Sequence, residues 1–298
     1  MIEICEVGPR DGLQNECKIV TTDKKVKLIE KLIDAGIRTL EVVSFVNPKV
    51  VPQMSDAEDV LERLPRLEGI RYGGLVLSRS GLERAQKTSV DYLHVAMTTS
   101  DAFNLKNAKR TVKESTEELT KVIREGVEAG KGVSGILGTA FGCPYEGEVP
   151  IERILESAES FLSAGCHELT LADTTGMANP AQVTKTVKAF QKKFGKDLNL
   201  GLHFHNTRGL GLANTLSGYE AGIQRFDSSI AGLGGCPFAP KAVGNVCTED
   251  MVNMFEGMGI NTNTNLTKLI ETAKWMEDYM DRPLDGMIMK AGIAQTAQ

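Results

Sequence analysis

The sequence predicts an α/β fold, namely a (β/α)8 TIM barrel with a short C-terminal helical extension. Short apolar runs rich in β-branched residues alternate with amphipathic charged stretches, and this alternation occurs eight times, about every 25 to 40 residues. One strand and one helix in each unit account for the pattern. Eight such units close into a barrel, whereas an open doubly wound sheet rarely needs so many regular repeats.

The apolar runs predict eight strands, each followed by a stretch in which apolar residues recur with the 3.6-residue period of a helix. The predicted strands span 2–7, 38–45, 70–77, 91–97, 132–140, 167–172, 198–205 and 225–230. The predicted helices span 23–36, 55–64, 80–88, 111–130, 150–164, 180–194, 209–222 and 248–258. Asn179 and Pro180 open one helix with a capping side chain and a proline at its first position. Four other helices end in Ala-Gly, at 35–36, 129–130, 164–165 and 221–222.

Residues 1–260 are expected to form one catalytic barrel. No composition shift, linker rich in Pro and Ser, or charge block marks a boundary within them. The remaining residues, 261–298, predict one further helix near 265–280 and a polar tail. We interpret this segment as a helical cap and tail of the same domain.

The charge balance and the cysteine pattern exclude several classes of function. The chain has 34 Lys and Arg against 39 Asp and Glu, a net charge of −5, so binding to nucleic acid or to an anionic membrane surface is not expected. No run approaches the ~20 apolar residues of a membrane span, and the first residues, MIEICEV, do not resemble a signal peptide. We therefore expect a cytoplasmic protein. The six cysteines form no CxxC pair, which favours free thiols over a disulfide framework or structural zinc.

Polar and glycine-rich motifs follow most of the predicted strands. Barrel enzymes place their reacting groups at these C-terminal strand ends and in the loops after them. The motifs are GPRDGLQNE (8–16), SFVNPKVVPQM (44–54), FGCPYEG (141–147), DTTG (173–176), HFHNTRG (203–209) and AGLGGCPFAPKAVGN (231–245). The sequence therefore predicts a site assembled from several strands.

His203 and His205 are the most informative pair, because their i, i+2 spacing on a strand directs both imidazoles to one face. A divalent cation makes such a pairing favourable, since neutral imidazole is a ready ligand. The alternative is a hydrogen-bonded pair in the core. His94 and His167 stand apart in the sequence, and we expect structural roles for them.

Asp11, at the end of the first strand, and Asn245, in the last loop, offer oxygen ligands that would complete the metal site. A mixed set of imidazole, carboxylate and amide oxygen suits Mg²⁺ or Mn²⁺. Asp11 in PRDG is also a common turn residue, so a purely structural role is the alternative.

Arg10 and Glu41 are charged residues in positions that call for a partner or a ligand. A fixed guanidinium at a strand end can stabilise an enolate oxygen or hold a carboxylate, and it can equally pair with Asp11 or Glu41. Glu41 lies between apolar strand residues, and if it faces the barrel lumen its burial needs a partner such as Arg10 or a lysine. Cys236, in a glycine-rich loop, is either a thiol acid or base over the barrel mouth or a small buried residue.

Taken together, the motifs resemble the 3-hydroxy-3-methylglutaryl-CoA lyase family, within the larger DRE-TIM metallolyase group that includes isopropylmalate and homocitrate synthases. The resemblance runs nearly end to end. It rests on EVGPRDGLQNE (6–16), SFVNPKVVPQM (44–54), GCPYEG (142–147), the HxH strand (203–205) and AGLGGCP with GN and TED (231–250). It implies retro-Claisen cleavage of 3-hydroxy-3-methylglutaryl-CoA to acetyl-CoA and acetoacetate, with a divalent metal and a homodimeric assembly.

The resemblance also implies roles for individual residues. The metal ligands would be Asp11, His203, His205 and Asn245, and the catalytic residues Arg10, Glu41, Cys236 and His203. Arg10 would steady the enolate, and Cys236 is a candidate proton donor. Contacts to substrate or CoA are expected from Ser44, Lys106, Asn107, Asp173 and Thr174.

Three residues depart from the family's usual pattern: Asn206 replaces a carboxylate, and Arg208 and Lys241 add positive charge. By direct count this makes the barrel mouth about three charges more positive. The alternative acyl substrate is therefore a relative such as citramalyl-CoA or a 3-hydroxyglutaryl-CoA with a longer 3-alkyl branch. A non-catalytic, CoA-binding barrel is a further alternative.

Overall fold

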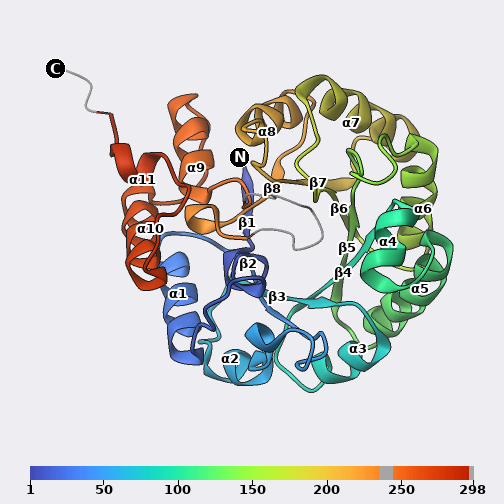
Figure 1. The fold of residues 1–298 in the computed structure, drawn as a ribbon, viewed down its shortest axis with the longest axis horizontal. Coiled ribbons are helices and arrows are strands. Elements are labelled where there is room, and N and C mark those ends of the chain that lie inside the picture. The colour runs from blue at the N-terminus through green and yellow to red at the C-terminus, as the bar shows by residue number, and fades with distance from the viewer. Residues whose placement is uncertain (235–243, 295–298) are drawn as a thin grey trace.

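The computed structural model describes residues 1–234 and 244–294. In these residues eight parallel strands follow one another around a closed barrel in sequence order, and the last strand pairs with the first (Figure 1). The strands are β1 (Glu3–Glu6), β2 (Thr39–Ser44), β3 (Arg71–Val76), β4 (Tyr92–Thr98), β5 (Gly132–Gly138), β6 (Glu168–Asp173), β7 (Asn199–Phe204) and β8 (Arg225–Ser228). None extends more than one residue beyond its predicted range, so the predicted barrel is confirmed.

The helices form a ring outside the strands, as Figure 1 shows. Those predicted are α1 (Thr22–Asp34), α2 (Ala57–Arg63), α3 (Arg79–Ala85), α5 (Val112–Glu128), α6 (Ile151–Ser163), α7 (Pro180–Phe194), α8 (Gly211–Glu220), α9 (Thr248–Gly257) and α10 (Leu266–Met280). The structure adds five short elements: the π-helical turn η1 (Gly8–Gly12), the 3-10 turns η2 (Pro52–Met54) and η3 (Ile230–Gly232), and the helices α4 (Asp101–Ala108) and α11 (Ile288–Ala291).

The predicted helix ends are present. The glycines at positions 36, 130, 165 and 222 have φ values of 100°, 73°, 112° and 101°, the left-handed region that glycine adopts without strain. At the other end of a helix, the Asn179 side chain accepts a 3.0 Å hydrogen bond from the backbone N–H of Gln182. Each helix therefore stops before the next strand begins.

Charged side chains fill the floor of the barrel, at the N-terminal ends of the strands. The guanidinium of Arg225 donates to Glu168 over 3.2 Å, and Arg71 pairs with both Glu168 and Glu3. Gly201 makes room for this layer, because a Cβ there would lie 2.8 Å from Cζ of Arg225. Pairing compensates the desolvation of Arg225 and Glu168, which are buried.

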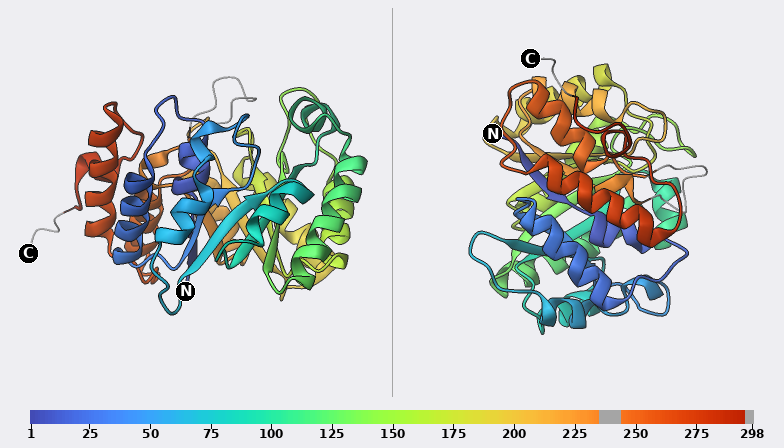
Figure 2. Two further views of the ribbon diagram at one scale, coloured as in Figure 1. Left: turned by 90° about the horizontal axis from the view of Figure 1, so that it is seen from below. Right: turned by 90° about the vertical axis from the view of Figure 1, so that its left-hand side faces the viewer.

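The C-terminal segment packs more closely than the sequence suggested. Helix α10 lies against α1 on the outside of the barrel, as the right-hand view of Figure 2 shows. The prediction of a polar tail is wrong for the stretch after α10, because Leu284 and Met289 are buried. The N–H of Asp285 also donates to the carbonyl of Ala231 over 3.1 Å, which ties this stretch to η3. The assignment of the segment to the same domain stays a prediction.

Two expectations from composition can be compared with the described residues. The five cysteines among them are free, as the absence of CxxC pairs predicted. No helix in the described part of the chain has the length and apolarity needed to cross a bilayer.

The close approach of α8 to the barrel generates a prediction about stability. A Cβ at Gly218 would lie 2.4 Å from Cδ1 of Leu202 and 3.3 Å from Phe226, both fully buried. We expect Gly218→Ala to lower the free energy of unfolding by up to about 2 kcal/mol, because the ~1–3 kcal/mol cost of overpacking outweighs the ~1 kcal/mol gain in helix propensity. Urea unfolding measures the change. Gly257→Ala, where nothing lies within 4 Å, is the matched control, and equal effects at both sites would contradict the prediction.

Candidate active site

The turn η1 places Arg10 and Asp11 at the C-terminal end of β1. The carbonyl of Val7 accepts hydrogen bonds from the N–H groups of Arg10, Asp11 and Gly12, so the turn folds around a single acceptor. The carboxylate of Glu6 accepts a further 2.7 Å bond from the N–H of Gly8. A side chain at Gly12 would meet Leu233 and Ser229 at 2.9 Å, so this glycine allows the first turn and the last loop to touch.

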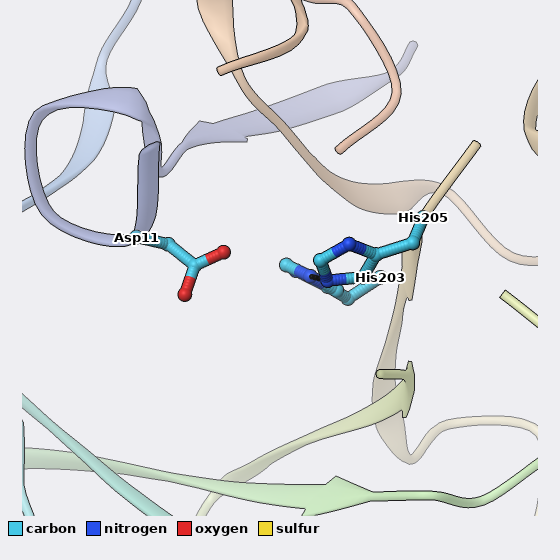
Figure 3. A group of neighbouring side chains, drawn as sticks. All are labelled: Asp11, His203 and His205. Carbon is cyan, nitrogen blue, oxygen red and sulfur yellow. Dashed lines mark hydrogen bonds between the residues drawn. The ribbon is translucent and has the colours of Figure 1, made fainter. Parts of the chain in front are cut away.

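Asp11, His203 and His205 converge on one point, as Figure 3 shows. One ligand atom from each residue lies within 4.8 Å of the others. The Nε2 atoms of His203 and His205 are 3.3 Å apart, so both rings face the same side of β7, as their spacing predicted. Two imidazole nitrogens and a carboxylate oxygen at this separation form a candidate metal site.

Asn245 supports this interpretation. Its amide Nδ2 donates to Asp11 over 2.8 Å and to the carbonyl of Leu233 over 3.1 Å, which fixes the side-chain orientation. The amide oxygen is buried, and no described residue hydrogen-bonds to it. An orphaned buried oxygen beside a carboxylate and two imidazoles is the arrangement that a hard divalent cation satisfies.

Asp227, on β8, is a functional residue that the sequence analysis missed. Its Oδ2 lies 3.3 Å from Nδ1 of His203, and the residue is buried. A carboxylate at Nδ1 fixes the ring orientation and leaves Nε2 available as a ligand. Burial alone would lower the pKa of His203, but the hydrogen bond and charge of Asp227, with Asp11, raise it. The signal in the sequence that could have identified Asp227 was the alternation of side chains along the strand RFDS, which places Arg225 and Asp227 on the same face.

Arg10 joins the metal site to Glu41. Its Nε donates to Oε2 of Glu41 over 2.6 Å, and its Nη1 donates to Oδ1 of Asp11 over 2.7 Å. Burial by itself would raise the pKa of both carboxyls, but the guanidinium together with nearby imidazoles and hydrogen bonds outweighs burial, and the pKa of each is lowered. His94 also lowers the pKa of Glu41, because its Nδ1 lies 2.9 Å from the other oxygen of that carboxylate. His94 therefore belongs to this buried cluster and does not stand apart.

A cavity of about 410 Å³ opens beside these residues, toward the C-terminal ends of the strands. Its charged and imidazole-bearing wall comes from η1, β7 and β8. The residues that line it are Arg10, Asp11, Gln14, Leu75, Leu77, Ala96, Met97, Thr98, Asn104, Asn107, Ala108, Arg110, Ser115, Leu119, Ile136, Gly138, Ala172, Thr174, His203, His205 and Asp227.

Of the five expected substrate contacts, two line the cavity and three do not. Asn107 and Thr174 line the cavity. Lys106 lies on α4, with its ammonium 3.5 Å from the centre of the Tyr145 ring. Ser44 is fully buried at the end of β2, and its hydroxyl has no partner among the described residues.

Asp173 is not among the residues that line the cavity. Its two oxygens accept hydrogen bonds from the N–H groups of Met177 and Ala178, over 2.8 and 3.1 Å. Burial raises its pKa to about 6, although these bonds oppose the shift. The geometry gives Asp173 a role in shaping the loop after β6.

The positive charge of Arg208 does not reach the cavity as expected. Nη1 of Arg208 donates to the carbonyls of Thr175 and Gly176, at 3.0 and 2.7 Å, and Arg208 does not line the cavity. Asn206 accepts from the N–H of Gly211 at the start of α8. Lys241 and Cys236 lie outside the described residues, so their expected roles stay predictions.

Two buried carboxyls hold the loops that carry the site. Glu6 accepts from the N–H of Gly8 and of Ile230, so it joins η1 to η3. Glu249 accepts from the N–H of Ala231, which has a positive φ of 54°. Burial raises the pKa of Glu6 to about 7 and that of Glu249 to about 8. These residues were not singled out from the sequence.

Comparison with known proteins places this site in a family. The family model described as HMGL-like matches residues 1–276. The chain belongs to the HMGL-like family. It is 43% identical to a hydroxymethylglutaryl-CoA lyase of Bacillus subtilis, over 95% of this chain and 94% of that protein. It is 38% identical to the (R)-citramalyl-CoA lyase of Chloroflexus aurantiacus, over 98% of this chain and 95% of the other.

The solved structures agree with this membership. An HMG-CoA lyase from Acinetobacter baumannii, solved with coenzyme A and 3-methylmalate, superposes with a TM-score of 0.95 at 40% identity. The match covers 100% of this chain and 97% of that one. The members of the family named here are carbon–carbon lyases, so the fold and the enzyme class of the chain follow from the same comparison.

The contact between Asp227 and His203 predicts metal affinity. We expect Asp227→Asn to weaken Mn²⁺ binding about 10- to 100-fold, because an amide cannot hold the imidazole by charge. Calorimetric titration of Mn²⁺ into the protein without substrate measures the effect, with thermal melting as the check on folding. Unchanged affinity in a folded variant would show that Asp227 does not orient His203.

The raised pKa of Glu249 predicts how stability depends on pH. The folded state keeps this carboxyl protonated to about pH 8, whereas the unfolded state releases the proton near pH 4.5. Between these two pH values the Glu249 carboxyl takes up a proton when the chain folds. The free energy of unfolding therefore falls as pH rises through that window. Glu249→Gln should reduce the fall by up to ~1.4 kcal/mol per pH unit, measured by urea unfolding from pH 5 to 8. The exposed Glu62→Gln is the control, and parallel curves for wild type and Glu249→Gln would contradict the prediction.

Proposed function

We propose that this chain is a divalent-metal-dependent lyase that cleaves 3-hydroxy-3-methylglutaryl-CoA to acetyl-CoA and acetoacetate. The observation that carries the proposal is the convergence of Asp11, His203, His205 and the orphaned amide oxygen of Asn245 beside the buried Arg10. The names of the relatives from Bacillus subtilis and Acinetobacter baumannii support the same reaction. Asp11, His203, His205 and Asn245 would hold Mg²⁺ or Mn²⁺.

The reaction breaks the bond between C2 and C3 of the acyl group. The 3-hydroxyl loses its proton and becomes the ketone of acetoacetate, while the electron pair of the broken bond forms the enolate of acetyl-CoA. That enolate then takes up one proton at carbon, so the products contain all the atoms of the substrate. The metal, when bound, supplies Lewis acidity toward the hydroxyl and a carboxylate oxygen of the substrate.

The chain's own residues account for the charges in this scheme. Arg10, fixed between Asp11 and Glu41, presents a preorganised cation that stabilises the enolate oxygen. His203 faces the cavity with Asp227 at its Nδ1, so its catalytic role would be to hold the metal through Nε2 beside the substrate hydroxyl. Glu41 holds Arg10 in place, and we propose Cys236 as the donor of the final proton.

The CoA portion would enter from the side of α4. Asn107 and Arg110 line the cavity there, and Lys106 projects from the same helix. Arg110, which the sequence analysis did not single out, is exposed and offers a local partner for a phosphate on an otherwise acidic protein. Thr174 lines the cavity at the end of β6.

Citramalyl-CoA is the second candidate substrate, because a relative of 38% identity is named as its lyase. Its cleavage would use the same metal site and release pyruvate in place of acetoacetate. The product alone distinguishes the two reactions. We also propose a homodimer, on the family resemblance.

The first test is cleavage of each thioester by the purified protein with Mg²⁺, with Mn²⁺ and after treatment with EDTA. We expect acetoacetate from 3-hydroxy-3-methylglutaryl-CoA, abolished by EDTA and restored by either metal. Pyruvate release from citramalyl-CoA, with no acetoacetate from the first substrate, would overturn the substrate and keep the reaction class. Absence of cleavage of either thioester with metal present would overturn the lyase itself.

Arg10→Lys separates catalysis from binding, because lysine keeps a positive charge beside Asp11 and Glu41 but lacks the forked guanidinium. We expect kcat to fall about 10²- to 10³-fold, the usual cost of losing one preorganised donor to an oxyanion. CoA affinity, measured by calorimetry, should change little. A variant that binds CoA normally and keeps its full kcat would show that Arg10 does not stabilise the enolate.

A further inference from the structure

His94 holds one oxygen of the buried carboxylate that pairs with Arg10. Its Nδ1 lies 2.9 Å from Oε1 of Glu41, whereas Nε of Arg10 donates to Oε2 over 2.6 Å. Because an ionised carboxylate only accepts hydrogen bonds, Nδ1 of His94 carries the proton in this contact. In the part of the chain that the structure describes, no other group hydrogen-bonds to Oε1. Each oxygen of Glu41 therefore has one partner residue.

The contact between His94 and Glu41 crosses an intervening strand. Glu41 of β2 pairs in register with Gly73 of β3, and Gly73 pairs with Tyr92 of β4. His94 lies two residues beyond Tyr92, on the same face of β4. A Cβ at Gly73 would lie 3.1 Å from Nε2 of His94. The imidazole can reach over β3 because position 73 has no side chain.

His94 is enclosed and does not reach the substrate cavity. It is only 6% exposed, and the ring of Tyr92 lies edge-on to it with the centroids 5.8 Å apart. Neither His94 nor Glu41 is among the described residues that line the cavity of about 410 Å³, whereas Arg10 is. His94 can therefore influence a bound substrate only through Glu41 and Arg10.

Burial makes this contact important for the state of Glu41. The carboxylate has no exposure to solvent, so water cannot replace a lost partner. An unpaired oxygen in such surroundings favours protonation of the carboxyl or its rotation toward another donor. Burial alone would raise the pKa of Glu41, but Arg10 and, after it, His94 lower it. Either change would loosen the hold of Glu41 on the guanidinium.

We propose that His94 is a positioning residue for the cleavage reaction, because it fixes the Glu41 carboxylate that directs the guanidinium of Arg10 at the enolate oxygen. The proposal rests on the proposed function. A positioning role needs the N–H at Nδ1, whereas a packing role needs only the volume of the side chain. This difference separates the two roles by experiment.

His94→Asn and His94→Leu form a matched pair of variants. Asparagine places an N–H close to the position of Nδ1, and leucine has the same shape without the donor. We expect His94→Leu to lower kcat about 10- to 100-fold and to change KM less than about threefold, because a misplaced guanidinium affects the transition state more than substrate binding. His94→Asn should recover most of the lost kcat.

His167→Leu is the control, because it removes an exposed imidazole that contacts the hydroxyl of Tyr92 over 2.8 Å and does not touch Glu41. It should keep the wild-type kcat, and thermal melting checks that each variant folds. Equal losses in His94→Leu and His94→Asn, or a wild-type kcat in folded His94→Leu, would overturn this inference and leave the proposed function standing. Failure of the wild-type protein to cleave either thioester would overturn both.

The route through Arg10 is tested by combining His94→Leu with Arg10→Lys. We expect the double variant to have the kcat of Arg10→Lys alone, because residues that act through one group give non-additive effects. Losses that multiply would show that His94 does not act through Arg10.

A measurement without substrate checks the same route. NMR follows the hydrogen exchange of the Arg10 Nε–H, whose resonance is assigned by its absence in Arg10→Lys. We expect faster exchange in His94→Leu than in the wild type, with His94→Asn close to the wild type. Equal exchange in His94→Leu and the wild type would overturn the positioning role.

Discussion

The candidate site depends on the buried guanidinium of Arg10. Glu41 is wholly removed from solvent, and Asp11 is partly so, and an isolated carboxylate in such surroundings would take up a proton. The forked side chain of Arg10 contacts both at once, which favours their ionised forms, together with the nearby imidazoles, and fixes their relative position. A cation site next to an enolate site needs both properties: a negatively charged ligand for the metal, and a positive group held a short distance away without mobility.

The surrounding loops are shaped to keep this arrangement in place. Glu6 and Glu249 bind backbone N–H groups of the first turn and the last loop, and Asp173 does the same after β6. Such bonds stabilise loop backbone that contains few regular hydrogen bonds of its own. The cost is that carboxyls with raised pKa values lie beneath a charged site, which links the integrity of the loops to pH.

Much of the fold could be predicted from sequence because period-2 and period-3.6 patterns and Ala-Gly endings are local signals. Asp11, His203 and His205 could be placed together because parallel strands bring their C-terminal ends to one edge. Three features could not be predicted: the loop-shaping role of Asp173, the partner of His94 and the position of Asp227. Each of them depends on contacts that the sequence pattern does not show. The buried stretch around Leu284 was missed for a related reason: it has no helical period, and its burial comes from packing against η3.

The hydrogen bond between Asp11 and Asn245 joins residues 234 positions apart in the chain. Two of the candidate metal ligands therefore come together only when β8 has closed against β1, the pairing with the largest sequence separation in the barrel. A growing polypeptide cannot assemble this ligand set until almost all of it has left the ribosome. Cation binding would then stabilise only the finished barrel, so a bound ion would act as a check on completed folding.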